Sequence, residues 1–169
     1  MEHENIGDFL YGDTGDYFEN VDELLQQVEY FVDALSDYKC DVALFPEFFN
    51  APLMGLSPDK SSIDAIWHLA GYTDEILTAI LRLAVQYNIN IIAGSMPMIE
   101  NDELYNVSYL CHRDGSLESQ YKLHLTPHEK SDWIMKGGDK LQVFDTDFGK
   151  IGVLICYDVE FPELGRILA

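Results

Sequence analysis

A cysteine at the end of an apolar run restricts the fold of this chain more than any other feature. Residues 151–155 are apolar or glycine and mostly β-branched, which predicts a short strand buried on both faces. Cys156 follows directly, and Phe161-Pro162-Glu163 is typical of the first turn of a helix, where proline is favoured. A thiol on such a strand-to-helix turn is pushed out of the sheet toward whatever binds there. A small apolar cysteine in the core would give the same local pattern.

Two other apolar runs also end at ionisable residues. Glu47 follows a strand predicted over residues 41–45, and Lys122 ends a strand predicted over residues 116–122. The end of a strand is where a side chain from the core layer meets a cleft. A carboxylate, a cation and a thiol in such settings can supply a base, a positive charge and a nucleophile. Together they favour a catalytic cysteine over a core cysteine.

Three motifs in this order resemble the nitrilase superfamily of carbon–nitrogen hydrolases. They are Phe45-Pro46-Glu47, then Tyr121-Lys122-Leu123-His124-Leu125-Thr126-Pro127-His128-Glu129, then Ile155-Cys156-Tyr157-Asp158 with Phe161-Pro162-Glu163. The similarity extends over about residues 20–169. Within the superfamily, the runs at residues 27–32, 87–95 and 143–147 are similar to a branch often fused behind an acetyltransferase domain.

The resemblance implies a role for each ionisable residue. The residue matching Cys156 forms a thioester, and the residue matching Glu47 takes the thiol proton, returns it to the leaving amine and later activates water. Lys122 and the backbone N–H of Tyr157 are expected to stabilise the oxyanion. Glu129 matches a second glutamate of the family and is expected to orient the substrate or Lys122. The alternatives are a solvated lysine and an ordinary surface ion pair of the glutamate.

A free thiol has a pKa of about 8.5 and is a poor nucleophile until that pKa falls. We expect Lys122 and the N-terminus of the following helix to lower the pKa of Cys156 below those of the other two cysteines. His124 and His128 are expected to shape their loop. We also expect Lys122→Ala and Glu47→Gln to abolish turnover without unfolding the protein, because packing demands little past a strand end.

Charge and composition narrow the possible partners. The chain carries 30 acidic and 10 basic residues, a net charge of −20, which argues against nucleic acid and anionic membranes. The three cysteines are scattered, no signal peptide is evident and no apolar run approaches membrane-spanning length. We therefore expect a cytoplasmic protein without a disulfide framework. Because metal-ligand spacings, GxGxxG and Walker loops are missing from the sequence, we expect no cofactor and no metal.

Periodicity predicts the order of helices and strands. An apolar stripe over residues 21–35 predicts a helix capped by Asn20, and Thr73 is expected to cap a helix that runs to residue 87. A short helix is expected over residues 63–69. The remaining strands are expected at 89–93, 104–110, 116–122, 141–144 and 150–155. This order predicts a layered α/β domain, and the resemblance implies the four-layer α-β-β-α sandwich of the nitrilase type.

Two departures from the family pattern bear on domain organisation. Residues 1–19 are polar and acidic, are expected to be poorly ordered, and contain nothing like the strand that begins the family fold. The family also continues well past the cysteine motif. We therefore expect residues 20–169 to be a partial carbon–nitrogen hydrolase domain, without the first strand and incomplete at the C-terminus. Such a piece is expected to be poorly stable and inactive alone, and a homo-oligomer when complete.

The sequence thus predicts hydrolysis of a non-peptide C–N bond through a Cys156 thioester. The expected substrate is a small amide or nitrile, with the amide favoured, and the expected product is ammonia or an amine. Two alternatives stay open. One is a catalytically silent fragment that only binds or packs, and the other is an acyltransferase that passes the same thioester to an amine acceptor.

Overall fold

The structure is a computed structural model that describes residues 18–57 and 59–169. Its elements in chain order are α2 Val21–Asp37, β1 Val42–Leu44, the 3₁₀ helix η1 Ala51–Leu56, α3 Ser62–Ala70, α4 Thr73–Gln86, β2 Asn90–Glu100, β3 Glu103–Cys111, β4 Leu117–Tyr121, α5 Pro127–Ser131, β5 Val143–Thr146, β6 Gly149–Gly152, the 3₁₀ helix η2 Cys156–Glu160 and α6 Pro162–Leu168. The predicted order is confirmed. The predictions for residues 1–19 concern chiefly residues 1–17, which lie outside the described residues.

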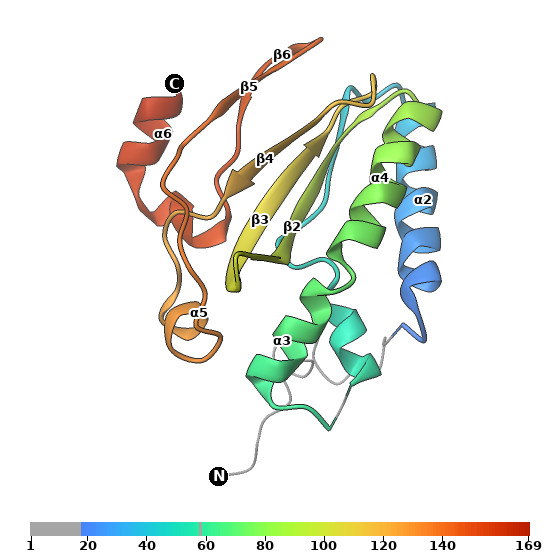
Figure 1. The fold of residues 1–169 in the computed structure, drawn as a ribbon. Helices are drawn as coiled ribbons and strands as arrows, with labels where there is room; N and C mark the ends of the chain where they lie inside the picture. The colour runs from blue at the N-terminus through green and yellow to red at the C-terminus, as the bar shows by residue number, and fades with distance from the viewer. Residues whose placement is uncertain (1–17, 58) are drawn as a thin grey trace.

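A four-stranded sheet lies at the centre of the fold (Figure 1). Its strand order is β1-β2-β3-β4, with β1 parallel to β2 and the other neighbours antiparallel. Helices α2 and α4 cover one face of the sheet (Figure 1). The two-stranded ribbon β5–β6 lies on the other side, and α6 lies beside this ribbon. The layers therefore follow the order helix, sheet, sheet, helix, which confirms the expected α-β-β-α arrangement.

Two apolar clusters hold the layers together. The larger one joins the helices to one face of the four-stranded sheet and includes Val28 and Val32 of α2 and Ile80 of α4. The smaller one, built on Ile92, Leu110 and Phe144, joins the opposite face to the ribbon. Full burial of a side chain of this size stabilises a fold by about 1.5–3 kcal/mol. None of the helices in the described part of the chain is long and apolar enough to cross a membrane.

The predicted cap of the first long helix is confirmed, whereas the cap of the second is wrong. Asn20 accepts a hydrogen bond from the backbone N–H of Glu23 at 3.0 Å, at the start of α2. Helix α4 has Tyr72 as its N-cap, and Thr73 is its first helical residue. The buried Thr73 hydroxyl donates instead to the carbonyl of Pro97 at 2.6 Å. The Thr73 hydroxyl, which the local sequence suggested as a helix cap, is therefore bound to Pro97 of β2 instead.

The prediction of one doubly buried strand over residues 151–155 is also wrong. Strand β6 ends at Gly152, and among the described residues only β5 pairs with it. Of the five residues only Ile155 is buried. Ile151 and Val153 pack on one side, against the smaller apolar cluster. A two-stranded ribbon contacts the larger sheet through one face, so β-branched composition here reflects one-sided packing.

Candidate active site

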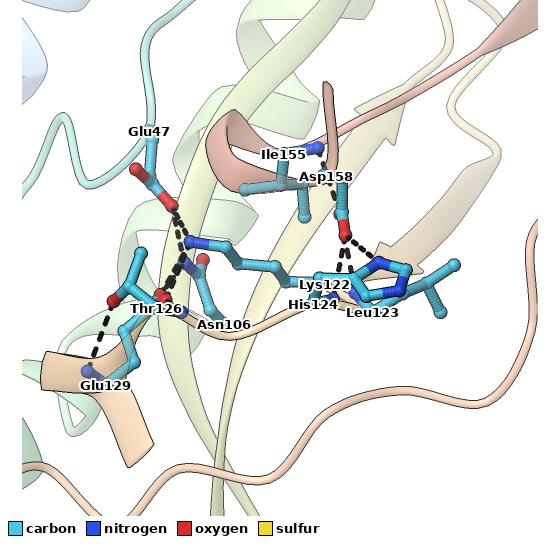
Figure 2. Close-up of polar contacts among 9 residues, drawn as sticks. All are labelled: Glu47, Asn106, Lys122, Leu123, His124, Thr126, Glu129, Ile155 and Asp158. Atoms are coloured by element: carbon cyan, nitrogen blue, oxygen red, sulfur yellow. Dashed lines mark hydrogen bonds and ion pairs between the residues drawn. The ribbon is translucent and has the colours of Figure 1, made fainter. Parts of the chain in front are cut away.

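Lys122 lies at the centre of a buried charged cluster (Figure 2). Its Nζ donates to Oε1 of Glu47 at 2.8 Å and to both carboxylate oxygens of Glu129 at 2.8 Å. Asn106 links the same two carboxylates, because its Nδ2 donates to Glu47 at 2.9 Å and to Glu129 at 3.0 Å. Lys122 is 1% exposed and Glu129 is 3% exposed. The solvated lysine and the surface ion pair are therefore both wrong.

Local backbone contacts fix each side chain of this cluster. The N–H of Lys122 donates to the carbonyl of Asn106 at 2.9 Å, and the carbonyl of Lys122 accepts from Gly138 at 2.8 Å. Glu129 is held by a capping box at the start of α5, in which its carboxylate accepts from the N–H of Thr126 at 2.7 Å. The Thr-Pro-His-Glu segment thus orients the glutamate by itself, as capping boxes do.

The position of Glu47 depends on a close approach between two backbone segments. Gly94 of β2 has a φ of +49°, and a Cβ there would lie 1.9 Å from the carbonyl oxygen of Pro46. The N–H of Phe48 donates to the carbonyl of Ser95 at 2.8 Å, and an isolated bridge joins Glu47 to Ser95. Glycine is the residue that tolerates both the positive φ and the contact.

We expect Gly94→Ala to displace Glu47 and to lower the free energy of unfolding. The added methyl group would collide with backbone atoms of Pro46 and Phe45, which cannot move aside as a flexible side chain could. The positive φ of residue 94 is also a conformation that alanine rarely adopts. Urea denaturation of the variant would measure the loss. Gly165→Ala is the matched control, because a Cβ at that exposed α6 position meets nothing within 4 Å. There alanine should be neutral or stabilise by about 0.5–1 kcal/mol. Equal stability of the two variants would contradict this account.

Cys156 occupies a strained turn, as the strand-to-helix pattern suggested. It is exposed, has a φ of +46° and begins η2. Helix α6 begins at Pro162, as predicted. The short 3₁₀ helix η2 separates the thiol from α6, so Cys156 does not lie at the N-terminus of an α-helix as expected.

Asp158 ties this turn to the strand end that carries the lysine (Figure 2). Its buried carboxylate accepts from the backbone N–H groups of Ile155 at 3.3 Å, Leu123 at 3.3 Å and His124 at 2.7 Å. Sequence reasoning missed this role and that of Asn106. An aspartate shortly after a turn residue often accepts nearby N–H groups, which is the signal available for Asp158. Asn106 lies within a strand, where its amide gave no comparable signal.

The two histidines of the loop have contacts that suit the expected structural role. His124 stacks on Phe161 with ring centroids 3.7 Å apart, and its Nδ1 lies 3.1 Å from Asp158. His128 pairs with Asp132 at 2.6 Å and packs edge-on against Trp133. These contacts hold the loop against η2 and α5.

Glu47 and Cys156 line the same pocket, which has a volume of about 80 Å³. Ser95 and Ser108 contribute polar groups to its lining, and most of the rest is apolar. Lys122 does not line the pocket and contacts Glu47 from the buried side. Within residues 18–57 and 59–169, no three His, Cys, Asp or Glu side chains are grouped to hold a metal ion. The Glu47 carboxylate and the Cys156 thiol therefore belong to one pocket, where both can contact a bound molecule.

Burial and ion pairing act in opposite directions on the charged cluster. Burial acts to lower the pKa of Lys122, but its hydrogen bonds to Glu129 and Glu47 outweigh burial and raise that pKa. Burial acts to raise the pKa of Glu129, but hydrogen bonds from Lys122, Thr126 and Asn106 outweigh it and lower that pKa. Both groups are therefore held in their charged forms.

The expected lowering of the Cys156 pKa is wrong. Partial burial and the adjacent Glu47 carboxylate raise the pKa of this thiol, and the positive charge of Lys122 does not overcome them. Lys122 is already neutralised by two carboxylates. The resting thiol therefore keeps its proton next to a carboxylate that can accept it. This arrangement fits a nucleophile that loses its proton to a general base as it attacks.

Comparisons with known proteins identify the family of this chain. The sequence pattern of the carbon–nitrogen hydrolases matches residues 11–169. Probable hydrolase YhcX of Bacillus subtilis is 48% identical over 148 residues, which cover 88% of this chain and 29% of that protein. Chloroplastic omega-amidase of Arabidopsis thaliana is 32% identical over 174 residues, which cover 98% of this chain and 45% of that protein.

A solved structure shows the same fold. Nit3 of Saccharomyces cerevisiae, a member of branch 10 of the nitrilase superfamily, superposes with a TM-score of 0.70 at 29% identity, over 86% of this chain and 53% of that chain. This chain thus spans about half, or less, of the length of these proteins. The particular similarity to the branch fused to an acetyltransferase stays a prediction. On the match to its sequence pattern over residues 11–169, the chain belongs to the carbon–nitrogen hydrolase family of the nitrilase superfamily.

Proposed function

We propose that this site hydrolyses the C–N bond of a small amide through a thioester on Cys156. The observation that carries the proposal is the shared pocket of Cys156 and Glu47, with Glu47 held from behind by Lys122 and Asn106. A thiol, a carboxylate at its side and a fixed positive charge are the groups that nucleophilic acyl transfer requires.

The first half of the reaction forms the thioester. Glu47 takes the proton from the Cys156 thiol as the sulfur attacks the amide carbon, and the carbonyl becomes a tetrahedral oxyanion. The same carboxyl group then gives the proton to the nitrogen, the C–N bond breaks and ammonia leaves. In the second half, Glu47 takes a proton from water as it attacks the thioester, and the thiol is restored with release of the acid.

The oxyanion is stabilised by the backbone and by the field of the charged cluster. The first N–H groups of a helix have no partner inside it, and Tyr157 is the second residue of η2. One such donor contributes roughly 2.7–4 kcal/mol to catalysis. Lys122 makes three hydrogen bonds to the two glutamates, which matches the three donors of an ammonium group. It therefore acts through its charge, and Glu129 acts by positioning it.

A primary amide at the end of a short chain is the favoured substrate. The similarity to an omega-amidase supports an amide over a nitrile, and the small pocket of about 80 Å³ at Cys156 suits a terminal carboxamide group.

Ammonia release from short primary amides tests the proposal. When these residues are part of a full-length domain, we expect release by the wild type, none by Cys156→Ala, and an acyl mass on Cys156 in acid-quenched samples. Amine-containing products formed with added amines would identify an acyltransferase instead. If neither ammonia nor an acylated Cys156 is found with amides or nitriles, the proposed hydrolysis is wrong. The better interpretation is then a catalytically silent domain that only binds or packs.

A further inference from the structure

A second polar row crosses the four-stranded sheet beside the charged cluster. Ser95 of β2 pairs with Ser108 of β3, and Ser108 pairs with Gln120 of β4. All three residues are buried. Gln120 has partners for both ends of its amide, because Nε2 donates to the carbonyl of Lys140 at 2.7 Å and Oε1 accepts from the N–H of Gln142 at 2.9 Å. This end of the row is structural.

Ser95 differs from Gln120 because its hydroxyl is unsatisfied. Its Oγ is buried and has no hydrogen-bond partner among the described residues, although the residue is only 1% exposed. Buried polar groups in proteins are nearly always paired, so each exception requires an explanation. Ser95 lines the pocket that contains Glu47 and Cys156. The unpaired hydroxyl therefore belongs to a residue that borders the space in which a substrate would react.

The lining of the pocket indicates which substrate atoms come near Ser95. Glu47, Ser95 and Cys156 all line the same small pocket of about 80 Å³, which is partly open to solvent. An amide carbon within reach of the Cys156 sulfur, with its nitrogen toward Glu47, therefore lies in the space that Ser95 also borders. The group nearest to Ser95 is then the reacting amide.

We propose that Ser95 is a specificity-determining residue whose hydroxyl oxygen accepts a hydrogen bond from the NH₂ group of a primary carboxamide. The inference rests on the proposed amide hydrolysis and names the group that selects its substrate. The isolated bridge between Glu47 and Ser95 brings the two backbones together, and both residues line the pocket in which Glu47 would protonate the leaving nitrogen. Esters have no N–H at this place, so Ser95 favours primary amides over esters.

Alkylation of Cys156 by two matched reagents tests the proposal without turnover. Iodoacetamide and methyl iodoacetate carry the same leaving group, and only the first has an NH₂ group. We expect Ser95→Ala to slow labelling of Cys156 by iodoacetamide by roughly three- to tenfold, as expected for one neutral hydrogen bond, and to leave labelling by methyl iodoacetate unchanged. Peptide mass spectrometry separates Cys156 from Cys40 and Cys111.

Thermal melting separates a binding role from a structural one. Removing an unpaired buried hydroxyl should leave the melting temperature of Ser95→Ala equal to or above that of the wild type. Ser119→Ala, also a strand serine but outside the pocket lining, should change neither labelling rate. Equal slowing of both reagents, slowing of neither, or a lowered melting temperature with both rates reduced would overturn the proposal. Ammonia release is not part of this readout, so the proposed hydrolysis can fail or stand independently of it.

Discussion

Lys122→Met is expected to destabilise the protein by about 3–5 kcal/mol and to abolish turnover. The substitution leaves the Glu47 and Glu129 carboxylates facing each other without a counter-charge, and Glu129 is buried. Breaking a buried ion pair by removing one partner costs about this much, because the remaining charge is unpaired. Whole domains are stable by only about 5–15 kcal/mol. The sequence alone suggested that Lys122 could be removed without unfolding the protein. Its burial between two carboxylates now leads us to expect a large loss of stability.

Urea denaturation measures this loss, and Lys136→Ala is its matched control. Lys136 Nζ lies 3.5 Å from a carboxylate oxygen of Glu103, and the two side chains are 53% and 44% exposed. Exposed pairs of this kind contribute about 0–1 kcal/mol. If Lys122→Met costs no more than Lys136→Ala, the charged cluster does not stabilise the fold.

The difference between wild type and Lys122→Met should also depend on pH. The pKa of Glu129 is lowered from its ordinary value of 4.5, so its contribution is present above about pH 4.5 and is lost as pH falls through the lowered value. The pKa of Lys122 is raised from 10.5, so its contribution is present below that pH and is lost as pH rises through the raised value. The difference should be largest between these limits.

Glu47→Gln is expected to slow turnover by about 10²- to 10⁴-fold and, at the same time, to make Cys156 easier to ionise. The loss of rate follows from removing the group that we propose as the general base. The second effect has the opposite sign because the Glu47 carboxylate is one of the groups that raise the pKa of the thiol. The midpoint of the pH profile for Cys156 alkylation should move to lower pH. A more reactive thiol in a less active enzyme is the signature to look for.

Glu160→Gln provides the control for this pair of effects. Glu160 is exposed, belongs to the same η2 turn as Cys156, and its substitution changes net charge by the same amount. It should alter neither turnover nor the alkylation midpoint appreciably. Amide hydrolysis at the wild-type rate in folded Glu47→Gln would remove Glu47 from the mechanism, and an unmoved or raised midpoint would show that its charge does not act on the thiol. Burial alone raises the pKa of Cys111 to about 12, which makes that thiol an internal slow reference.

Helix starts and caps that depend on neighbouring residues could be predicted from the sequence. The Asn20 cap and the Pro162 helix start depend on residues within a few positions of each other. The ionisable site residues were found through motif order, and the structure brings Glu47, Lys122 and Glu129 into contact.

Features that depend on distant partners could not be predicted in the same way. The Thr73 hydroxyl donates to the carbonyl of Pro97 instead of capping its own helix. The strand expected over residues 151–155 ends early, where its pairing with β5 ends. The raised pKa of Cys156 depends on how far Lys122 is already neutralised, which no spacing in the sequence reveals.

The topology also orders how this site comes together during folding. Strands β2, β3 and β4 form consecutive hairpins whose contacts need only short chain closures, and they carry Ser95 and Asn106. Glu47 lies on the segment after β1. Strand β1 pairs in parallel with β2 only after the chain has crossed through α3 and α4. The ion-pair partner of Glu47, Lys122, is 75 residues away in the sequence. Closing longer loops costs more entropy before contacts compensate. We therefore expect strands β2 to β4 to pair before Glu47 reaches Lys122 during folding. In a refolding experiment, the β3 amides should become protected from hydrogen exchange earlier than those of β1.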